Sequence, residues 1–345
     1  MKATFLGCAT VVFFTAACSS SDTGTSKAPK THADGGSTSR TDGGSASGGG
    51  GATSSDTDGG STDGGWPKST DTRPCDTSTL QSGTFDFDFG GSSYQYLVHI
   101  PPSYDGTKRT PLVLNWHGLT SNATEQASFS GMNPVSDEEG FLVVYPNSPD
   151  MSWNAGVCCG AGATAMRDDV GFARALVQKI STDACVDSKR IYSTGMSNGG
   201  FMSHMLGCEA ADIFAAVAPV AGKVGIADCE PSRPVPIMDF HGTKDPLVPY
   251  DTGGLSGENL SVPDTMQHWA DRDGCTGDAD ITYQNATVTC KTWSHCTASV
   301  LVTFCSAEGE GHCWPGTAFC PYGAYTTDID ASHQMAAFFK KFSLP

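Results

Sequence analysis

The chain has 345 residues and a formal net charge of −17 at pH 7. This excess of acidic side chains argues against nucleic acid or an anionic membrane surface as a partner, because both would repel the protein. Residues 75–345 have the length of one enzyme-sized domain, which is enough for a substantial core.

The first 18 residues have the pattern of an export signal. Lys2 provides the positive start, and the apolar run after it is too short to span a bilayer. The segment Thr15-Ala-Ala-Cys18 resembles the lipobox of bacterial lipoproteins, which predicts Cys18 as the lipidated residue. Ordinary secretion remains the alternative, since Thr15 is an unusual start for that box. Either route exports the protein, and the membrane would be reached only through the lipid, at the outer membrane or cell surface.

Residues 19–74 consist almost entirely of Gly, Ser, Thr and Asp and contain almost no apolar side chain before Trp66. Such a segment cannot bury enough surface to offset the entropy lost on ordering. We therefore expect a disordered linker between the lipid-bearing end and the domain of residues 75–345.

The remaining sequence alternates short apolar runs with helical patterns, which is typical of an α/β fold with a mostly parallel central sheet and helices on both faces. The first two predicted strands flank Gly90-Gly91 and should form an antiparallel hairpin. Strands are predicted at residues 84–89, 94–100, 111–116, 141–145, 191–194, 214–220, 235–240, 286–293 and 300–306. Helices are predicted at residues 168–181, 199–206, 265–271 and 330–342.

The cysteines agree with export. Twelve of the 14 remain when Cys8 and Cys18 are set aside, and an even number in an exported protein predicts disulfides. A zinc site is the alternative, but no two Cys-x-x-Cys spacings occur. The pairs expected are Cys208–Cys229, Cys275–Cys290, Cys296–Cys305 and Cys313–Cys320, with Cys75, Cys158, Cys159 and Cys185 pairing among themselves.

The segment from Ile191 to Phe201 contains a serine flanked by glycines two residues away on either side, Gly195 and Gly199. A nucleophile elbow has this pattern, because the sharp turn strains the serine backbone and brings the neighbouring chain too close for side chains at the glycines. The hydroxyl of Ser197 would then lie above the sheet at a helix N-terminus, which favours developing negative charge.

A serine nucleophile of this kind needs an acid and a histidine on later loops, in the order Ser, Asp, His. Asp245 follows the predicted strand at 235–240, and His312 follows the strand at 300–306. In this arrangement Asp245 orients the imidazole, which takes the proton of Ser197 and returns it to the leaving group. Asp239 and His241 are the competing candidates. Asp239 lies inside a strand, and His241 precedes the acid in the chain.

An oxyanion hole needs backbone N–H groups aimed at the tetrahedral intermediate. One donor should be Asn198, directly after the nucleophile. The other should come from the loop after the strand at 111–116, where Leu119 is the first candidate and Thr120 the second. His117 at the start of this loop is expected to be structural.

At this point the chain resembles the polyhydroxybutyrate depolymerase/feruloyl esterase group of α/β-hydrolases, of the carbohydrate esterase family 1 type. The similar motifs are Gly195-Met-Ser-Asn-Gly-Gly-Phe-Met202, the segments 214–222 and 235–250, Gly311-His-Cys-Trp-Pro-Gly316 and the segment from Trp153 to Phe172. The resemblance implies Ser197, Asp245 and His312 as the triad, with no metal or organic cofactor. It leaves the ester open among feruloyl esters, acetylated xylan and polyhydroxyalkanoates.

Trp153 and Trp314 are candidates to line the acyl or sugar pocket, because aromatic faces stack on both kinds of ring. The expected function is a serine esterase on plant cell-wall polysaccharide, with feruloyl esters first and acetyl esters second. Polyhydroxyalkanoate depolymerisation is the first alternative. A non-catalytic surface-binding lipoprotein on a hydrolase scaffold is the second.

Overall fold

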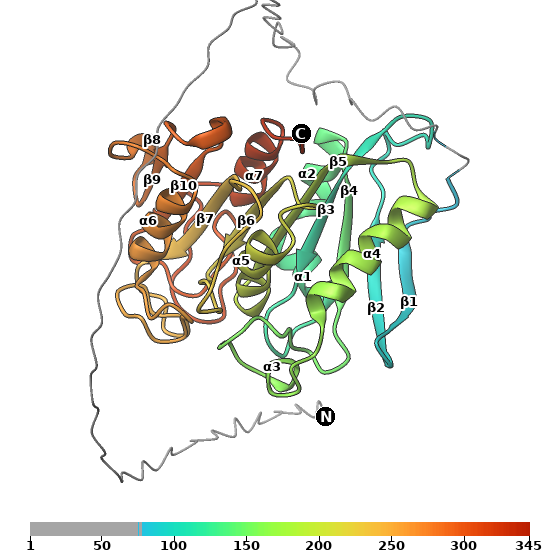
Figure 1. The fold of residues 1–345 in the computed structure, drawn as a ribbon, viewed down its shortest axis with the longest axis horizontal. Helices are drawn as coiled ribbons and strands as arrows, with labels where there is room; N and C mark the ends of the chain where they lie inside the picture. Colours follow the sequence, from blue (N-terminus) through green and yellow to red (C-terminus); the bar gives the residue numbers. More distant parts are fainter. Residues whose placement is uncertain (1–74, 76–77) are drawn as a thin grey trace, which may run out of the picture. The chain divides into compact units, whose positions relative to one another are not determined.

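A ten-stranded sheet organises the part of the chain that the computed structural model describes, which is residue 75 and residues 78–345. The predicted signal, Cys18 and the linker lie outside the described residues. The strand order is β1-β2-β4-β3-β5-β6-β7-β10-β9-β8 (Figure 1). The strands are β1 Gly83–Phe89, β2 Ser92–His99, β3 Thr110–Trp116, β4 Leu142–Asn147, β5 Val186–Met196, β6 Ala216–Val220, β7 Ile237–Gly242, β8 Asp280–Asn285, β9 Val288–Trp293 and β10 Val302–Ala307.

The centre of the sheet is parallel. Strands β4, β3, β5, β6, β7 and β10 pair in parallel, whereas β1, β2, β8 and β9 pair antiparallel at the two edges. The hairpin expected around Gly90-Gly91 is formed by β1 and β2. The prediction of a mostly parallel sheet is therefore confirmed.

Helices cover both faces of this sheet, as central strands that are buried on both faces require. Along β3, Leu112 and Leu114 enter one core cluster and Val113 enters the other. Helices α4, α5 and α6 pack into the first cluster, and α1, α2 and α7 into the second (Figure 1). The helices are α1 Ala123–Ser130, α2 Met132–Glu139, the short α3 Ala161–Thr164, α4 Asp169–Asp183, α5 Asn198–Glu209, α6 Val262–Arg272 and α7 Ala331–Phe339.

The sequence missed the edge strand β8. Its side chains are almost all exposed, so no apolar periodicity marks it. The strand expected at 286–293 does form, as β9, but it runs antiparallel between β8 and β10.

Every cysteine of the described residues is in a disulfide: Cys75–Cys185, Cys158–Cys159, Cys208–Cys229, Cys275–Cys296, Cys290–Cys305 and Cys313–Cys320. The expected pairs Cys275–Cys290 and Cys296–Cys305 are wrong. Cys290 on β9 lies directly opposite Cys305 on β10, and strand register of this kind is not visible in cysteine spacing. Six disulfides are typical of a protein exported to an oxidising compartment.

Among the described helices, none has both the length and the apolar character needed to cross a bilayer.

Candidate active site

Ser197 stands at the turn between β5 and α5 with φ 58° and ψ −122°. A serine rarely adopts a positive φ, and such strain persists only where the surrounding chain imposes it. A Cβ atom at Gly195 would lie 2.6 Å from the carbonyl oxygen of Trp116, and one at Gly199 would lie 2.1 Å from the same oxygen. The end of β3 therefore passes too close for any side chain at these two positions, which is the physical reason for the glycine spacing.

Asp245 and His312 meet at the carboxyl ends of neighbouring strands, β7 and β10. The Nδ1 atom of His312 lies 2.7 Å from Oδ2 of Asp245, and Oδ1 accepts the N–H groups of Leu247 and Val248, both at 2.8 Å. Burial is the largest single influence on Asp245 and opposes its ionisation, but the hydrogen bond and charge of His312, the charge of His241 and the Val248 N–H together outweigh it and lower the pKa of the carboxyl. The carboxylate can only accept, so Nδ1 carries the proton and Nε2 is left as an acceptor.

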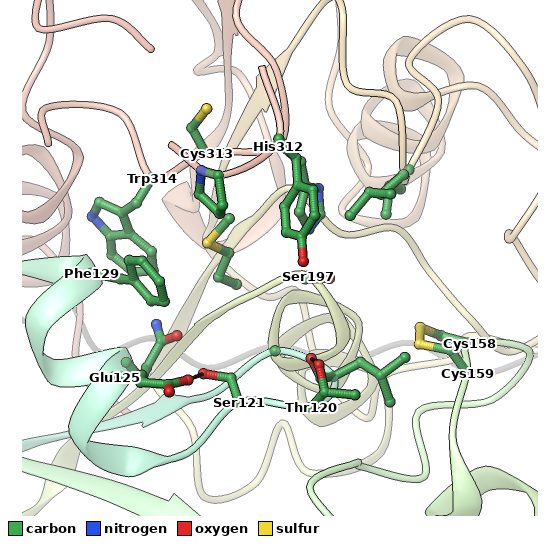
Figure 2. Close-up of a pocket in the computed structure, with 18 of the residues that line it drawn as sticks. Thr120, Ser121, Glu125, Phe129, Cys158, Cys159, Ser197, His312, Cys313 and Trp314 are labelled. Atoms are coloured by element: carbon green, nitrogen blue, oxygen red, sulfur yellow. Dashed lines mark hydrogen bonds between the residues drawn. A yellow bond between two sulfur atoms is a disulfide. The ribbon is translucent and has the colours of Figure 1, made fainter. Parts of the chain in front are cut away.

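Ser197 and His312 both line a cavity of about 510 Å³. Figure 2 shows them in the middle of this cavity, with Phe129 and Trp314 on one side and the Cys158–Cys159 disulfide on the other. The two side chains make no hydrogen bond to each other in the described part of the chain. Such bonds are often long before substrate binds, so the arrangement is compatible with a nucleophile and its base.

The competing pair lies beneath the cavity. Asp239 is buried beside Nε2 of His204 at 3.2 Å, away from Ser197. His241 is also buried, and its Nε2 lies 2.9 Å from the carbonyl oxygen of Val248 and 3.5 Å from Oδ2 of Asp245. Burial lowers the pKa of His241, so this imidazole is neutral, and it contacts both the loop of Asp245 and the carboxyl oxygen that His312 binds.

Of the three expected oxyanion donors, Thr120 is excluded. Its N–H donates to the carbonyl of Met151 at 2.8 Å, because the loop after β3 turns at Thr120 with a positive φ. The N–H of Leu119 makes no hydrogen bond within the described residues, and that of Asn198 opens α5, where helix N–H groups have no partner inside the helix. These two groups are free to bind a ligand.

His117 holds the peptide that carries the Leu119 N–H. Ser148 donates its N–H to Nε2 of His117 at 3.3 Å, so Nδ1 carries the proton and donates to the Gly118 carbonyl at 2.7 Å. Burial lowers the pKa of His117 to about 4, which keeps the ring neutral. A carbonyl and the following N–H point in opposite directions, so anchoring the Gly118 oxygen also orients the Leu119 donor.

Of the two tryptophans expected to line the pocket, only one does so. Trp314 lines the cavity and donates from Nε1 to Ser332. Trp153 does not line it, which corrects the expectation. Its ring is fully buried, packs edge-on against Trp116 at 5.0 Å and donates from Nε1 to the carbonyl of His117 at 3.0 Å. An indole N–H needs a partner when buried, and here the oxyanion loop supplies it.

Two parts of the cavity wall were not foreseen. Phe129 and Phe319 stack with ring centroids 5.6 Å apart and planes at 9°. Tyr322 also lines the cavity, with its ring centroid 6.3 Å from that of His312. The Cys158–Cys159 disulfide lies in the opposite part of the wall (Figure 2). Phe319 and Tyr322 lie in a loop, where aromatic side chains carry no periodic signal in the sequence, and only the structure shows their exposure, 59% and 51%.

Glu310 lies buried in the loop that carries His312. From its burial we predict that the stability of the protein depends on pH. Burial raises its pKa to about 8, and the charge of Asp245 adds to the shift. Between its ordinary value of 4.5 and about 8, the folded state keeps the proton and the unfolded state loses it. The free energy of unfolding should therefore fall as pH rises through this window, at a slope approaching about 1.4 kcal/mol per pH unit from this group.

Glu310→Gln should remove this contribution, because an amide does not ionise. Urea unfolding at pH 5 and pH 8.5 should give a smaller loss of stability in Glu310→Gln than in the wild type. Glu308→Gln, at an exposed position two residues earlier, should behave like the wild type. Parallel pH profiles for Glu310→Gln and the wild type would contradict the assignment.

The described residues contain no group of three or more His, Cys, Asp or Glu side chains arranged to hold a metal ion.

Comparison with known proteins finds one matching family model and several similar esterases. Residues 94–252 match the family model described as Esterase PHB depolymerase. Feruloyl esterase B of Piromyces equi is 36% identical over 233 residues, which cover 63% of this chain and 42% of that protein. The bifunctional acetylxylan esterase/xylanase XynS20E of Neocallimastix patriciarum is 26% identical, covering 62% of this chain and 30% of that protein. The chain thus spans less than half the length of these two curated relatives.

Among solved structures, an acetyl xylan esterase from Aspergillus awamori matches with a TM-score of 0.51 at 18% identity. The match covers 75% of this chain and 100% of that chain. The fold is that of the α/β-hydrolases.

Proposed function

Residues 94–252 match the family model described as Esterase PHB depolymerase, and on that premise we propose that the chain is a serine carboxylic ester hydrolase that releases feruloyl groups, and secondly acetyl groups, from plant cell-wall polysaccharide. The observation that carries the proposal is a strained, accessible serine beside an Asp245–His312 pair in one apolar cavity.

The proposed reaction is acyl transfer through Ser197. Its Oγ attacks the ester carbonyl while Nε2 of His312 takes the proton, and the oxyanion accepts the N–H groups of Leu119 and Asn198. The bond to the alcohol oxygen breaks, and His312 returns the proton to that oxygen. Water then attacks the acyl-enzyme by the same route, which releases the acid and restores Ser197.

The preference for feruloyl esters is supported by the wall of the cavity. A volume of about 510 Å³ is within the usual range for sites of drug-sized ligands and is far more than an acetyl group fills. Phe129 and Phe319 offer accessible aromatic surface against which a hydroxycinnamoyl ring can pack, and the buried Trp314 lies in the wall beside them. The relative named feruloyl esterase B agrees with this substrate class.

A panel of methyl ferulate, acetylated xylan and a polyhydroxybutyrate suspension tests the substrate. We expect kcat/KM for the feruloyl ester to exceed that for an acetyl ester of the same alcohol by at least about tenfold, from a buried aromatic contact of about one to two kcal/mol. Phe319→Ala should lower the feruloyl value and leave the acetyl value nearly unchanged. Faster clearing of the polyester suspension than ferulate release would favour the depolymerase alternative.

Lipid attachment at Cys18 belongs to the proposal as well, on the sequence of the export signal alone, and the mass of the mature N-terminal residue would test it.

A further inference from the structure

The loop of residues 148–160 lies directly behind the chain that carries the Leu119 donor. Ser148 donates its N–H to Nε2 of His117, and Trp153 donates from Nε1 to the His117 carbonyl. On the other side of the donor peptide, Thr120 donates its N–H to the carbonyl of Met151 at 2.8 Å. The chain on both sides of the donor peptide is therefore held by this one loop.

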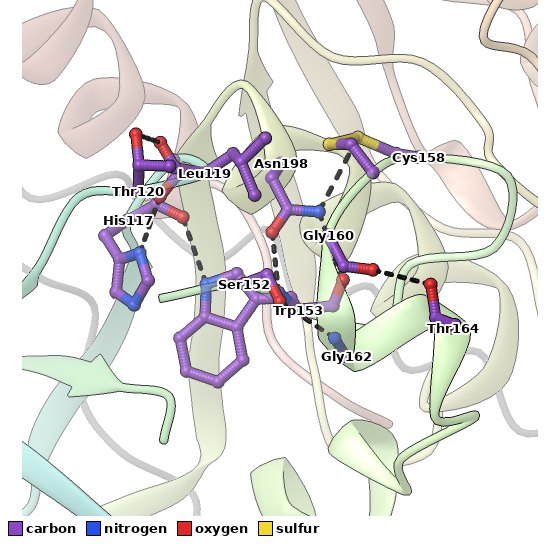
Figure 3. Close-up of a disulfide and its surroundings, with 12 residues drawn as sticks. His117, Leu119, Thr120, Ser152, Trp153, Cys158, Gly160, Gly162, Thr164 and Asn198 are labelled. Atoms are coloured by element: carbon purple, nitrogen blue, oxygen red, sulfur yellow. Dashed lines mark hydrogen bonds between the residues drawn. A yellow bond between two sulfur atoms is a disulfide. The ribbon is translucent and has the colours of Figure 1, made fainter. Parts of the chain in front are cut away.

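The same loop also forms hydrogen bonds with Asn198, the residue that provides the second donor. Oδ1 of Asn198 accepts the Trp153 N–H at 2.6 Å, and Nδ2 of Asn198 donates to the Trp153 carbonyl at 3.1 Å and contacts Sγ of Cys158 at 3.6 Å. The Asn198 side chain is completely buried. Figure 3 shows it between Trp153 and the disulfide, and it is not among the residues that line the cavity. Its role is thus to anchor the start of α5.

The Cys158–Cys159 disulfide lies where these contacts converge. Cys158 touches Asn198 on one side. On the other, a Cβ atom at Gly160 would lie 2.9 Å from Cδ1 of Leu119 and 2.4 Å from Cβ of Ser152, so the backbone directly after the disulfide packs against the first donor residue (Figure 3). A bond between adjacent cysteines closes a small ring that includes their peptide, and this prevents the peptide from rotating.

Global stability does not explain a disulfide at this position. Stabilisation by a disulfide grows with the length of the loop it closes. Cys75–Cys185 closes a separation of 110 residues, whereas Cys158–Cys159 joins neighbours and removes almost no freedom from the unfolded chain. Its effect must therefore be local, and the local structure is the support of the two donors.

We propose that the Cys158–Cys159 disulfide is a positioning element for the oxyanion donors Leu119 and Asn198, and that its reduction lowers the rate of acyl transfer. The inference rests on the proposed esterase function. A dithiol reductant supplies both electrons: its two thiols become a cyclic disulfide, the bond between Cys158 and Cys159 breaks, and each cysteine sulfur ends as a thiol.

The test is the double variant Cys158→Ser/Cys159→Ser in the full domain. Loss of one oxyanion donor costs about 10²–10³ in kcat, so a displaced pair should lower kcat by about 10–100-fold with KM changed less than about threefold. The affinity of an arylboronic acid, which forms a tetrahedral adduct on Ser197, should fall by a similar factor, whereas the affinity of the product ferulate should not. A purely structural role would not separate these two ligands.

Two further variants sharpen the result. Cys275→Ser/Cys296→Ser removes a disulfide that does not line the cavity, and should leave kcat and boronate affinity near those of the wild type. Asn198→Ala keeps the backbone N–H but loses the side-chain anchor, so it should lower kcat as the double cysteine variant does. Combining Asn198→Ala with Cys158→Ser/Cys159→Ser should cost much less than the sum, because both act on the same support.

Treatment of folded wild type with dithiothreitol covers the case in which the double variant does not fold. Activity should fall as mass spectrometry records reduction at residues 158–159 and recover on reoxidation. Where the double variant does fold, it should lose nothing more under the same treatment. A double variant, or a reduced wild type, with kcat and boronate affinity within about twofold of the untreated wild type would overturn the inference. Failure of the esterase proposal is a separate result, since then the wild type itself would lack Ser197-dependent activity.

Discussion

Ser197→Ala is expected to lower kcat on methyl ferulate by about 10⁴–10⁶-fold, because it removes the atom that forms the acyl-enzyme. The residual rate would come from the oxyanion donors and substrate binding alone. The fold should persist, because alanine keeps the Cβ atom of Ser197. That atom packs closely against Gly118, since a Cβ built on Gly118 would lie only 3.3 Å from it. The measurements are steady-state kinetics, labelling by a fluorophosphonate probe and circular dichroism.

Ser203→Ala is the matched control for Ser197→Ala. It removes a hydroxyl from the same helix, where Ser203 bonds Ser193 at 3.0 Å beneath the elbow. We expect its kcat to stay within about tenfold of the wild type and its labelling to persist. A wild type that the fluorophosphonate does not label would instead favour the non-catalytic lipoprotein, and labelling that survives in Ser197→Ala would assign the nucleophile elsewhere.

Asp245→Asn is expected to lower kcat by about 10⁴-fold with little change in KM. The Leu247 and Val248 N–H groups both point at Oδ1, so the amide oxygen of asparagine would take that place and its NH₂ group would face Nδ1 of His312. That nitrogen would then have to accept, which moves the ring proton to Nε2. His312 could no longer take the proton of Ser197.

The control for Asp245→Asn is Asp239→Asn, which alters a buried carboxylate on the preceding strand. Asp239 contacts His204 and not His312, so its loss should lower the free energy of unfolding more than it lowers kcat. Proton NMR should record the His312 Nδ1–H signal in wild type and Asp239→Asn but not in Asp245→Asn. Equal kcat values for Asp245→Asn and the wild type would remove Asp245 from the proposed triad.

The features that were predicted correctly from the sequence depend on local patterns of residues. The apolar runs predicted the central parallel strands, because a strand buried on both faces is mostly apolar along its whole length and not only at alternate positions. The spacing of Gly195 and Gly199 around Ser197 predicted the elbow, because the backbone that the turn requires involves only adjacent residues. The chain order of Ser197, Asp245 and His312 follows from the order of strands, and the structure brings Asp245 and His312 to 2.7 Å. Their catalytic roles stay predictions.

Contacts between distant segments were decided only by the tertiary structure. Thr120 is not available as an oxyanion donor, because its N–H donates to the carbonyl of Met151 on another loop. Trp153 does not line the cavity, because its buried indole donates a hydrogen bond to the carbonyl of His117.

The sequence by itself therefore determined the fold class, the elbow and the candidate triad, since each depends on local geometry or on chain order. Strand register paired Cys290 with Cys305, and loop packing brought Cys158 and Cys159 against Asn198. Pairings of this kind depend on which surfaces meet after folding, and spacing along the chain does not encode them.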